Sequence, residues 1–167
     1  MGWTSRSDAE PCCGELPGAV RDGEEIARLL HINNAPPEHE PFKRKDFYPK
    51  SGEEAFEDAC GIADGCSVTR MSGKTDHDVC SAAAQLAGEK REPRGAFIAI
   101  AGDLREIRVP DSDDQAIFIY DDPNEDRGHA VMRASEAISK GQFDEVRVKI
   151  HGAFRTRIAQ DASRSPR

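Results

Sequence analysis

Two short apolar runs impose the strongest constraint on how this chain can fold. They are GAFIAIAG at 95–102 and QAIFIYD at 115–121. In both runs apolar residues fall on both sides of an extended chain, and glycine bounds the first run at each end. This pattern is typical of strands that are covered on two faces. We therefore predict a buried central strand over the first run and a further strand over the second.

Helical periodicity precedes these strands. DGEEIARLLHI at 22–32 has Asp22 as a cap and an apolar stripe, and SGEEAFEDACGIA at 51–63 repeats the pattern. TDHDVCSAAAQLAG at 75–88 predicts a third helix that ends at Gly88. Its predicted inward residues are Val79, Cys80, Ala83 and Leu86.

Three further elements are expected around and after the apolar runs. A glycine-aspartate pair can turn the chain, so we predict a hairpin over 96–110. A helix is expected to begin near Asn124 or Asp126 and to end at Gly141. DEVRVKIHGAFRTR at 144–157 alternates apolar and basic residues, which predicts a half-buried strand with a basic outer face.

Helices followed by strands indicate an α+β fold. We expect N-terminal helices packed on one face of a small, mainly antiparallel sheet, with one helix between the last two strands. The chain of 167 residues suits one domain, which we place at 22–158. Polar segments without periodicity at 1–21 and 159–167 are expected to be flexible tails.

Charge and composition narrow the classes of function. The formal net charge of −8 hides an asymmetry, because 127–167 holds nine Lys or Arg and four acids, a net of +5, which leaves −13 for 1–126. The five cysteines include no Cys-x-x-Cys pair, so neither a disulfide scaffold nor a closed zinc site is expected. No signal peptide or apolar run of about 20 residues is seen, and we expect a cytoplasmic protein without a membrane partner.

An acidic loop and a lone histidine form the first candidate site. Asp121 and Asp122 end an apolar strand, Glu125 and Asp126 follow, and His129 opens the predicted helix. Carboxylates with one imidazole suit Mg²⁺ or Mn²⁺ binding, or general acid–base catalysis. The alternative is that the acids cap a helix and His129 makes only a local hydrogen bond.

The basic strand is the second candidate site. Its cations, Arg147, Lys149, Arg155 and Arg157, recur at the spacing of one strand face and can follow a phosphate backbone. No aromatic residue lies between them on that outer face to stack bases, and the acidic run at 111–126 offers an internal partner instead. His151, on the same strand, can join His129 in a two-histidine catalytic site.

The chain also resembles a group of small uncharacterised bacterial proteins. The residues that carry the resemblance are Phe56, Ser67 and Val68 in a Phe-loop-Ser-Val element, and His129 and Ala130, which match the His-Ala of a later Asn-x-x-His-Ala element in the group. In this chain the asparagine, Asn124, lies five residues before His129. The resemblance spans about 26–134 and implies a bacterial, stand-alone domain. It brings no activity with it.

These observations favour an accessory or interaction domain that binds a protein partner or a small anionic ligand without turnover and without a cofactor. The first alternative is a metal-dependent hydrolase of phosphodiesters or nucleotides, with Asp121, Asp122 and Asp126 on Mg²⁺ or Mn²⁺ and His129 or His151 as base. The second alternative is a nucleic-acid-binding protein, which the acidic half of the chain disfavours.

Overall fold

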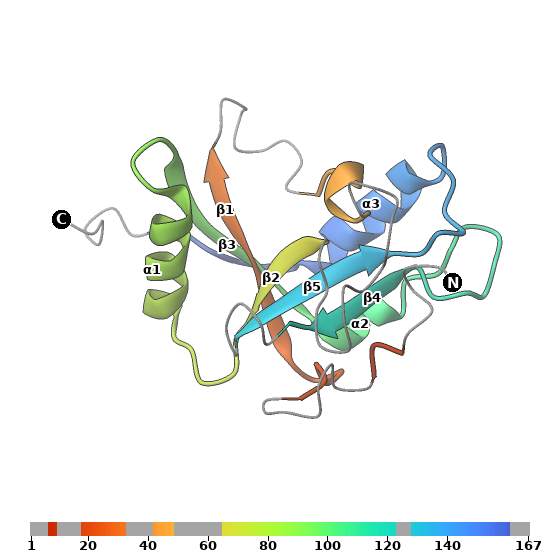
Figure 1. Ribbon diagram of the computed structural model, residues 1–167, viewed down its shortest axis with the longest axis horizontal. Coiled ribbons are helices and arrows are strands. Elements are labelled where there is room, and N and C mark those ends of the chain that lie inside the picture. The colour runs from red at the N-terminus through yellow and green to blue at the C-terminus, as the bar shows by residue number, and fades with distance from the viewer. Residues whose placement is uncertain (1–6, 10–17, 33–41, 49–64, 123–127, 161–167) are drawn as a thin grey trace.

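A computed structural model describes residues 7–9, 18–32, 42–48, 65–122 and 128–160 (Figure 1). Its elements in chain order are β1 (Glu25–Ile32), η1 (Arg44–Asp46), β2 (Cys66–Arg70), α1 (Asp76–Ala87), β3 (Glu92–Ile100), α2 (Ala101–Arg105), β4 (Ile117–Asp121), β5 (His129–Ala134), α3 (Phe143–Ala153) and β6 (Thr156–Ile158). The predicted α+β class is confirmed.

The strands form one six-stranded sheet in the order β4-β5-β2-β1-β3-β6, and every neighbouring pair is antiparallel. Because side chains alternate along a strand, the register divides the sheet into two faces. We call the side that carries Ile26, Val68 and Ile119 the first face, and the side that carries Ala27 and Val131 the second face.

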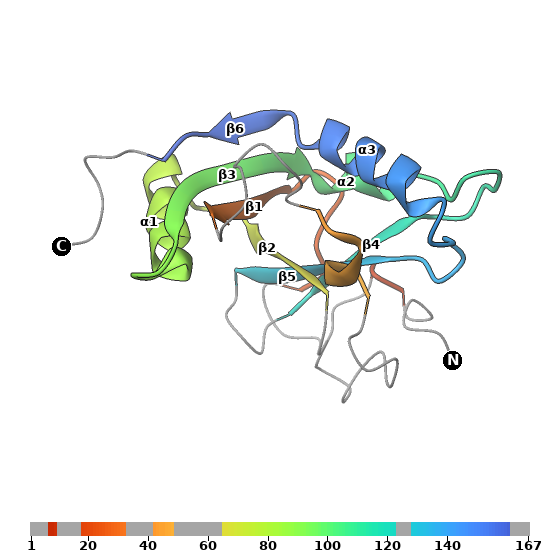
Figure 2. The same ribbon diagram turned by 90° about the horizontal axis from the view of Figure 1, so that it is seen from above.

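Helices cover both faces rather than the one face that the sequence predicts. Leu104 of α2 and Val146 of α3 join the main hydrophobic core, which lies on the first face. Val79 of α1 packs with Ala27 and Ile98 on the second face, at the β1-β3 end of the sheet. In Figure 2, β6 lies above β3, and α3 lies beyond the end of β3, beside α2.

The segment predicted as a first helix is the strand β1. It lies between β2 and β3 and is covered on both sides, so Ile26 faces the main core while Ala27 and Leu29 face α1. Apolar residues therefore follow one another without strict alternation, and this arrangement imitates a helical stripe. Packing on both faces of the sheet, rather than the spacing of apolar residues, therefore determines that this segment is a strand.

The elements predicted over 124–141 and 144–157 are also wrong, and their types are reversed. Residues 129–134 form β5, in which every side chain after His129 is buried. Residues 143–153 form α3, because Phe143, Val146 and Ile150 recur at helical spacing and are buried. Val148, which the alternating pattern turns inward, is 70% exposed.

Other predictions meet mixed outcomes. The third helix is confirmed as α1, although Leu86 faces solvent. The two apolar runs are strands as predicted: β3 lies inside the sheet, between β1 and β6, and β4 lies at its edge. The hairpin over 96–110 is wrong, because the chain enters α2 directly after β3. The helix over 51–63 lies outside the described residues.

None of the helices in the described part of the chain combines the length and apolarity needed to cross a bilayer.

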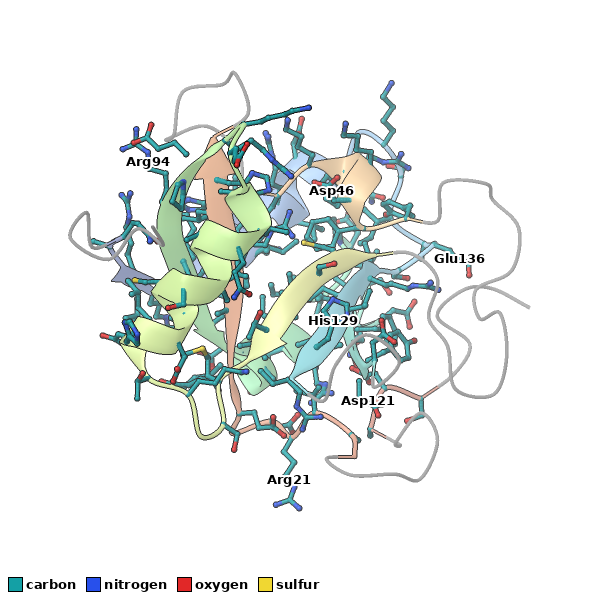
Figure 3. All side chains as sticks on the ribbon, turned by 60° about the vertical axis from the view of Figure 1, so that its left-hand side comes forward. Arg21, Asp46, Arg94, Asp121, His129 and Glu136 are labelled. Atoms are coloured by element: carbon teal, nitrogen blue, oxygen red, sulfur yellow. The ribbon has the colours of Figure 1, made fainter. Side chains whose placement is uncertain are left out.

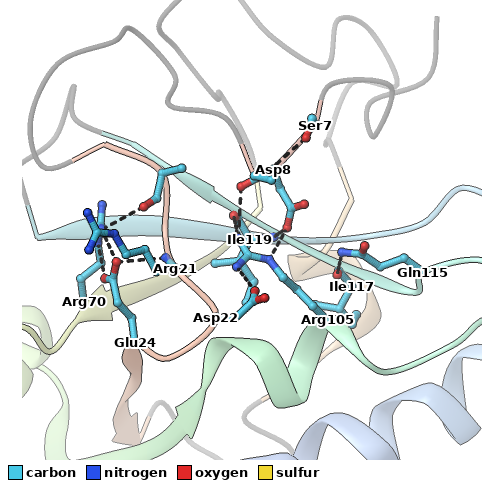
Figure 4. A network of polar contacts seen from close by, with 12 residues as sticks. Ser7, Asp8, Arg21, Asp22, Glu24, Arg70, Arg105, Gln115, Ile117 and Ile119 are labelled. Carbon is cyan, nitrogen blue, oxygen red and sulfur yellow. Dashed lines mark hydrogen bonds and ion pairs between the residues drawn. The ribbon is translucent and has the colours of Figure 1, made fainter.

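A buried ion pair closes the outer edge of β4 (Figure 4). The Asp8 carboxylate accepts hydrogen bonds of 2.8 Å from Arg105 Nε and from the Ile119 backbone N–H, and Arg105 Nη2 donates to the Ile119 carbonyl at 3.1 Å. An edge strand otherwise presents such groups to other chains. Asp8 and Val20 lie in the predicted tail over 1–21, yet both are buried.

A second ion pair links β2 to the start of β1 (Figure 4). Arg70 donates from Nη2 and Nε to the two carboxylate oxygens of Glu24, at 2.6 and 2.9 Å, and from Nη1 to the Gly18 carbonyl. Burial alone would raise the pKa of Glu24, but the hydrogen bonds and charge of Arg70 hold it below its ordinary value. Folding therefore favours the ionised carboxylate.

This pKa predicts a loss of stability in acid. The lowered pKa of Glu24 stabilises the fold above the unfolded value of about 4.3, and the stabilisation is lost as pH falls through the folded value. Glu24→Gln should therefore flatten the dependence of the unfolding free energy on pH below about 4.3, measured by urea unfolding. Glu25→Gln, at an exposed carboxylate on the same strand, is the control. If the unfolding free energy of Glu24→Gln falls with decreasing pH as steeply as that of the wild type, Glu24 is not the group responsible for the loss of stability in acid.

Candidate functional site

The first candidate is the pair of Asp122 and His129, where β4 and β5 meet (Figure 3 labels His129). His129 Nδ1 lies 3.0 Å from Asp122 Oδ2, and the Asp122 backbone N–H donates to the His129 carbonyl at 3.2 Å. Only 13% of the His129 side chain and 7% of the Asp122 side chain are exposed. A carboxylate at Nδ1 fixes the orientation of the ring. The same contact also joins the end of β4 to the start of β5.

The other predicted metal ligands do not join this pair. The register places Asp122 and His129 on the second face, beside Tyr120 and Val131, whereas Asp121 pairs with Ala130 and lies on the first face. Asp126 lies outside the described residues, as does Glu125. Within the described ranges, no three His, Cys, Asp or Glu side chains gather closely enough to hold a metal ion.

The predicted basic strand face does not exist, because Arg147 and Lys149 lie on the helix α3. Arg147 pairs with Asp144 at 3.1 Å, one turn away, and Lys149 pairs with Glu145 at 2.8 Å. These are the internal partners that the sequence leaves open as an alternative, but they come from the same helix rather than from 111–126. Half of the predicted binding residues are thus engaged within α3.

The other two predicted cations lie on β6 and just before it. Arg155 is 76% exposed and approaches Asp103 only to 3.9 Å. The Arg157 guanidinium lies over the Phe97 ring, 5.8 Å from its centroid. Across the part of the chain that the structure describes, no carboxylate forms an ion pair with Arg157. Arg157 therefore remains available for a ligand.

Three strands place two arginines on either side of an aromatic ring. Phe97 on β3 is the register partner of Arg157 on β6 and also of Arg28 on β1, so all three lie on the first face. We call Arg28, Phe97 and Arg157 the cation–aromatic row. With strands about 4.8 Å apart, its two arginine α-carbons lie about 10 Å apart. Arg28 donates to the Ser67 carbonyl at 2.9 Å and lies 3.9 Å from Asp46.

His151 lies above this row, at the last turn of α3. Its ring centroid is 5.6 Å from that of Phe97 and 6.4 Å from that of Phe42, and both contacts are edge-to-face. His151 therefore lies on the first face, whereas His129 lies on the second. The sheet separates the two histidines, and the predicted two-histidine site is not formed.

More cations border the row. Lys43, Arg44 and Lys45 at η1 are exposed, and the Arg44 guanidinium lies 4.5 Å from the Tyr48 ring centroid. The surface around the row is thus basic, although the whole chain is acidic. Sequence reasoning missed it because Phe97 belongs to a strand distant in sequence from Arg157. The signal in the sequence was a large aromatic residue in the otherwise small and aliphatic run at 95–102.

Comparisons of the chain with family models, with curated proteins and with solved structures found no match. The residues that carry the bacterial resemblance are in part neighbours in space. Val68 and Ala130 are register partners on β2 and β5, and Ser67 faces Val131. Phe56 lies outside the described residues.

Proposed function

We propose that this protein is a binding domain without turnover and that its ligand is anionic. The ligand would lie on the cation–aromatic row and the basic residues around it. The observation that carries the proposal is the placement of Arg157. Its guanidinium is held over Phe97, carries no described carboxylate partner, and lies on an exposed strand at the edge of the sheet.

The electrostatics of the surface support this choice. Arg28 and Arg157 flank one ring, and the cations of η1 and Arg155 surround them. Against them stand Asp46 and Asp103, each 3.9 Å from an arginine. Ion pairs at such distances near solvent contribute little, so a ligand with several negative charges can displace them.

Turnover at Asp122 and His129 is the weaker alternative. The pair has the hydrogen bond that orients a general base, but both side chains are largely buried. Of the predicted catalytic and metal-binding residues that the structure describes, only these two come together. A structural role explains the contact equally well, because it joins the end of β4 to the start of β5.

The proposal is tested with inorganic tripolyphosphate as the anionic probe, by isothermal titration calorimetry at low salt. We expect binding that weakens as salt rises, and we expect Arg157→Glu to lower the affinity at least tenfold. Lys140→Glu is the matched control, because it makes the same change of charge at an exposed lysine before the opposite end of α3. It should change the affinity less than twofold.

Two results would overturn the proposal. One is the absence of tripolyphosphate binding at 20 mM salt in the wild-type protein. The other is an equal loss of affinity in Arg157→Glu and Lys140→Glu, which would show that only the total charge matters.

A further inference from the structure

We infer that the anionic ligand of the cation–aromatic row is a single-stranded nucleic acid. This inference rests on the proposed function and specifies its ligand. Binding of single strands combines cations that follow the phosphates with planar side chains that stack on bases. The cations alone would fit any polyanion. The planar groups are what distinguish a nucleic acid.

The row offers a stacking platform that is already in place. Phe97 is partly buried and packs on the main core, so its ring does not have to be ordered by the ligand. The guanidinium of Arg157 lies over this ring, and the His151 ring meets it at an interplanar angle of 68°. A base can stack on the outer surface of such a guanidinium or take its place against the ring.

β6 and the residue before it supply two cations close together. Arg157 lies on β6, and Arg155 directly precedes the strand, beside Asp103. Side chains two residues apart along a strand lie about 6.7 Å apart. This spacing suits successive phosphates of an extended strand. β6 is also the last strand of the sheet, and beyond it no described strand pairs with its outer edge. The backbone N–H groups of that edge add hydrogen-bond donors for phosphate oxygens.

The small size of the basic surface favours a single strand over a duplex. The whole chain carries a net charge of −8, so a long polyanion meets repulsion outside this surface. A duplex presents one negative charge per about 1.7 Å, whereas a short single strand has fewer charges and exposes its bases. An acidic peptide brings charge but no planar group for Phe97. Single-stranded nucleic acid fits both properties of the row.

The experiment measures fluorescence anisotropy of a labelled 12-nucleotide oligo(dT) at several salt concentrations. With two or three phosphates neutralised, the logarithm of the affinity should fall with the logarithm of salt with a slope between about −1.4 and −2.1. Phe97→Leu keeps every charge and should lower the affinity about tenfold through lost stacking. Phe97→Tyr keeps the ring and should bind like the wild type.

Phe118→Leu is the matched control. It removes a phenyl ring from the second face on β4, at the other end of the sheet, and should not change oligo(dT) binding. Circular dichroism melting of each variant establishes that it is folded at the assay temperature. If Phe97→Leu is unfolded there, the pair Phe97→Tyr and Phe97→Met replaces it, with the tenfold loss of affinity expected only in Phe97→Met.

The outcomes separate this inference from the proposed function. Tripolyphosphate affinity should be the same in wild type and Phe97→Leu, since the probe has no base. If tripolyphosphate binds but oligo(dT) affinity is unaffected by Phe97→Leu, stacking and the nucleic-acid inference are overturned while anion binding survives. Tighter binding of a 12-residue oligoglutamate than of oligo(dT) would replace the nucleic acid with an acidic protein partner. If no probe binds, both proposals fail.

Discussion

Asp8→Ala should destabilise the protein by about 3 kcal/mol, because it removes the buried carboxylate opposite Arg105 and leaves Arg105 Nε and the Ile119 backbone N–H without their acceptor. The Asp8 and Arg105 side chains are only 8% and 12% exposed. The same carboxylate oxygen serves Arg105 and the Ile119 N–H, so one substitution removes both hydrogen bonds. Urea unfolding followed by circular dichroism measures the effect.

The matched control is Asp22→Ala. Asp22 also binds Arg105, with 2.8 Å between Asp22 Oδ1 and Arg105 Nη1, but its side chain is 79% exposed. Water replaces such a partner, so the loss should stay below about 1 kcal/mol. Equal losses in the two variants would show that burial of Asp8 does not determine its contribution. Self-association of Asp8→Ala through the uncovered β4 edge is a further expected result, seen by light scattering.

Gly95→Ala should be the most damaging of the glycine substitutions in β3 and its flanking turns. Gly95 has a φ of +75°, and an added β-carbon would meet the Ile158 carbonyl on β6. Alanine would therefore adopt an unfavourable backbone conformation and also force β3 and β6 apart. We expect a loss about 2 kcal/mol larger than in Gly88→Ala, from overpacking alone.

Gly88→Ala separates the two causes. Gly88, the cap of α1, has a φ of +60°, but nothing lies within 4 Å of an added β-carbon. It therefore carries the conformational cost, about 1 to 2 kcal/mol, without the clash. Faster amide hydrogen exchange over 156–158 in Gly95→Ala, and not in Gly88→Ala, would locate the damage in β6. Equal stability of the two variants would contradict the clash.

Sequence reasoning predicted the class and three of the elements well. GAFIAIAG and QAIFIYD are apolar runs of strand length, and the helix at 75–88 has a cap and a glycine stop. It failed where a central strand is covered on both faces, as in β1 and β5, because burial on both sides removes alternation. For α3, Val148 completed an alternating pattern by chance, although Phe143, Val146 and Ile150 already marked a helix.

The candidate sites were predicted only in part, because they depend on which strands become neighbours in the sheet. Asp122 and His129 are seven residues apart, and the β4-β5 pairing brings them together as neighbours in a sheet. Arg28, Phe97 and Arg157 lie on three strands far apart in the chain, so only the sheet order reveals the row. Local patterns report on the chain nearby. They do not report which strands become neighbours.

The strand order also bears on how fast this chain can fold. β4 and β5 pair locally, but β5 must also pair with β2, where Cys66 meets Met132, and Asp8 must reach Ile119. Closing such long loops costs conformational entropy before the contacts that offset it can form. Chains rich in contacts between residues distant in sequence therefore fold slowly. We expect the β4-β5 hairpin to form early and the edge ion pair to form last. Until then, the β4 edge of a newly made chain is open to other chains.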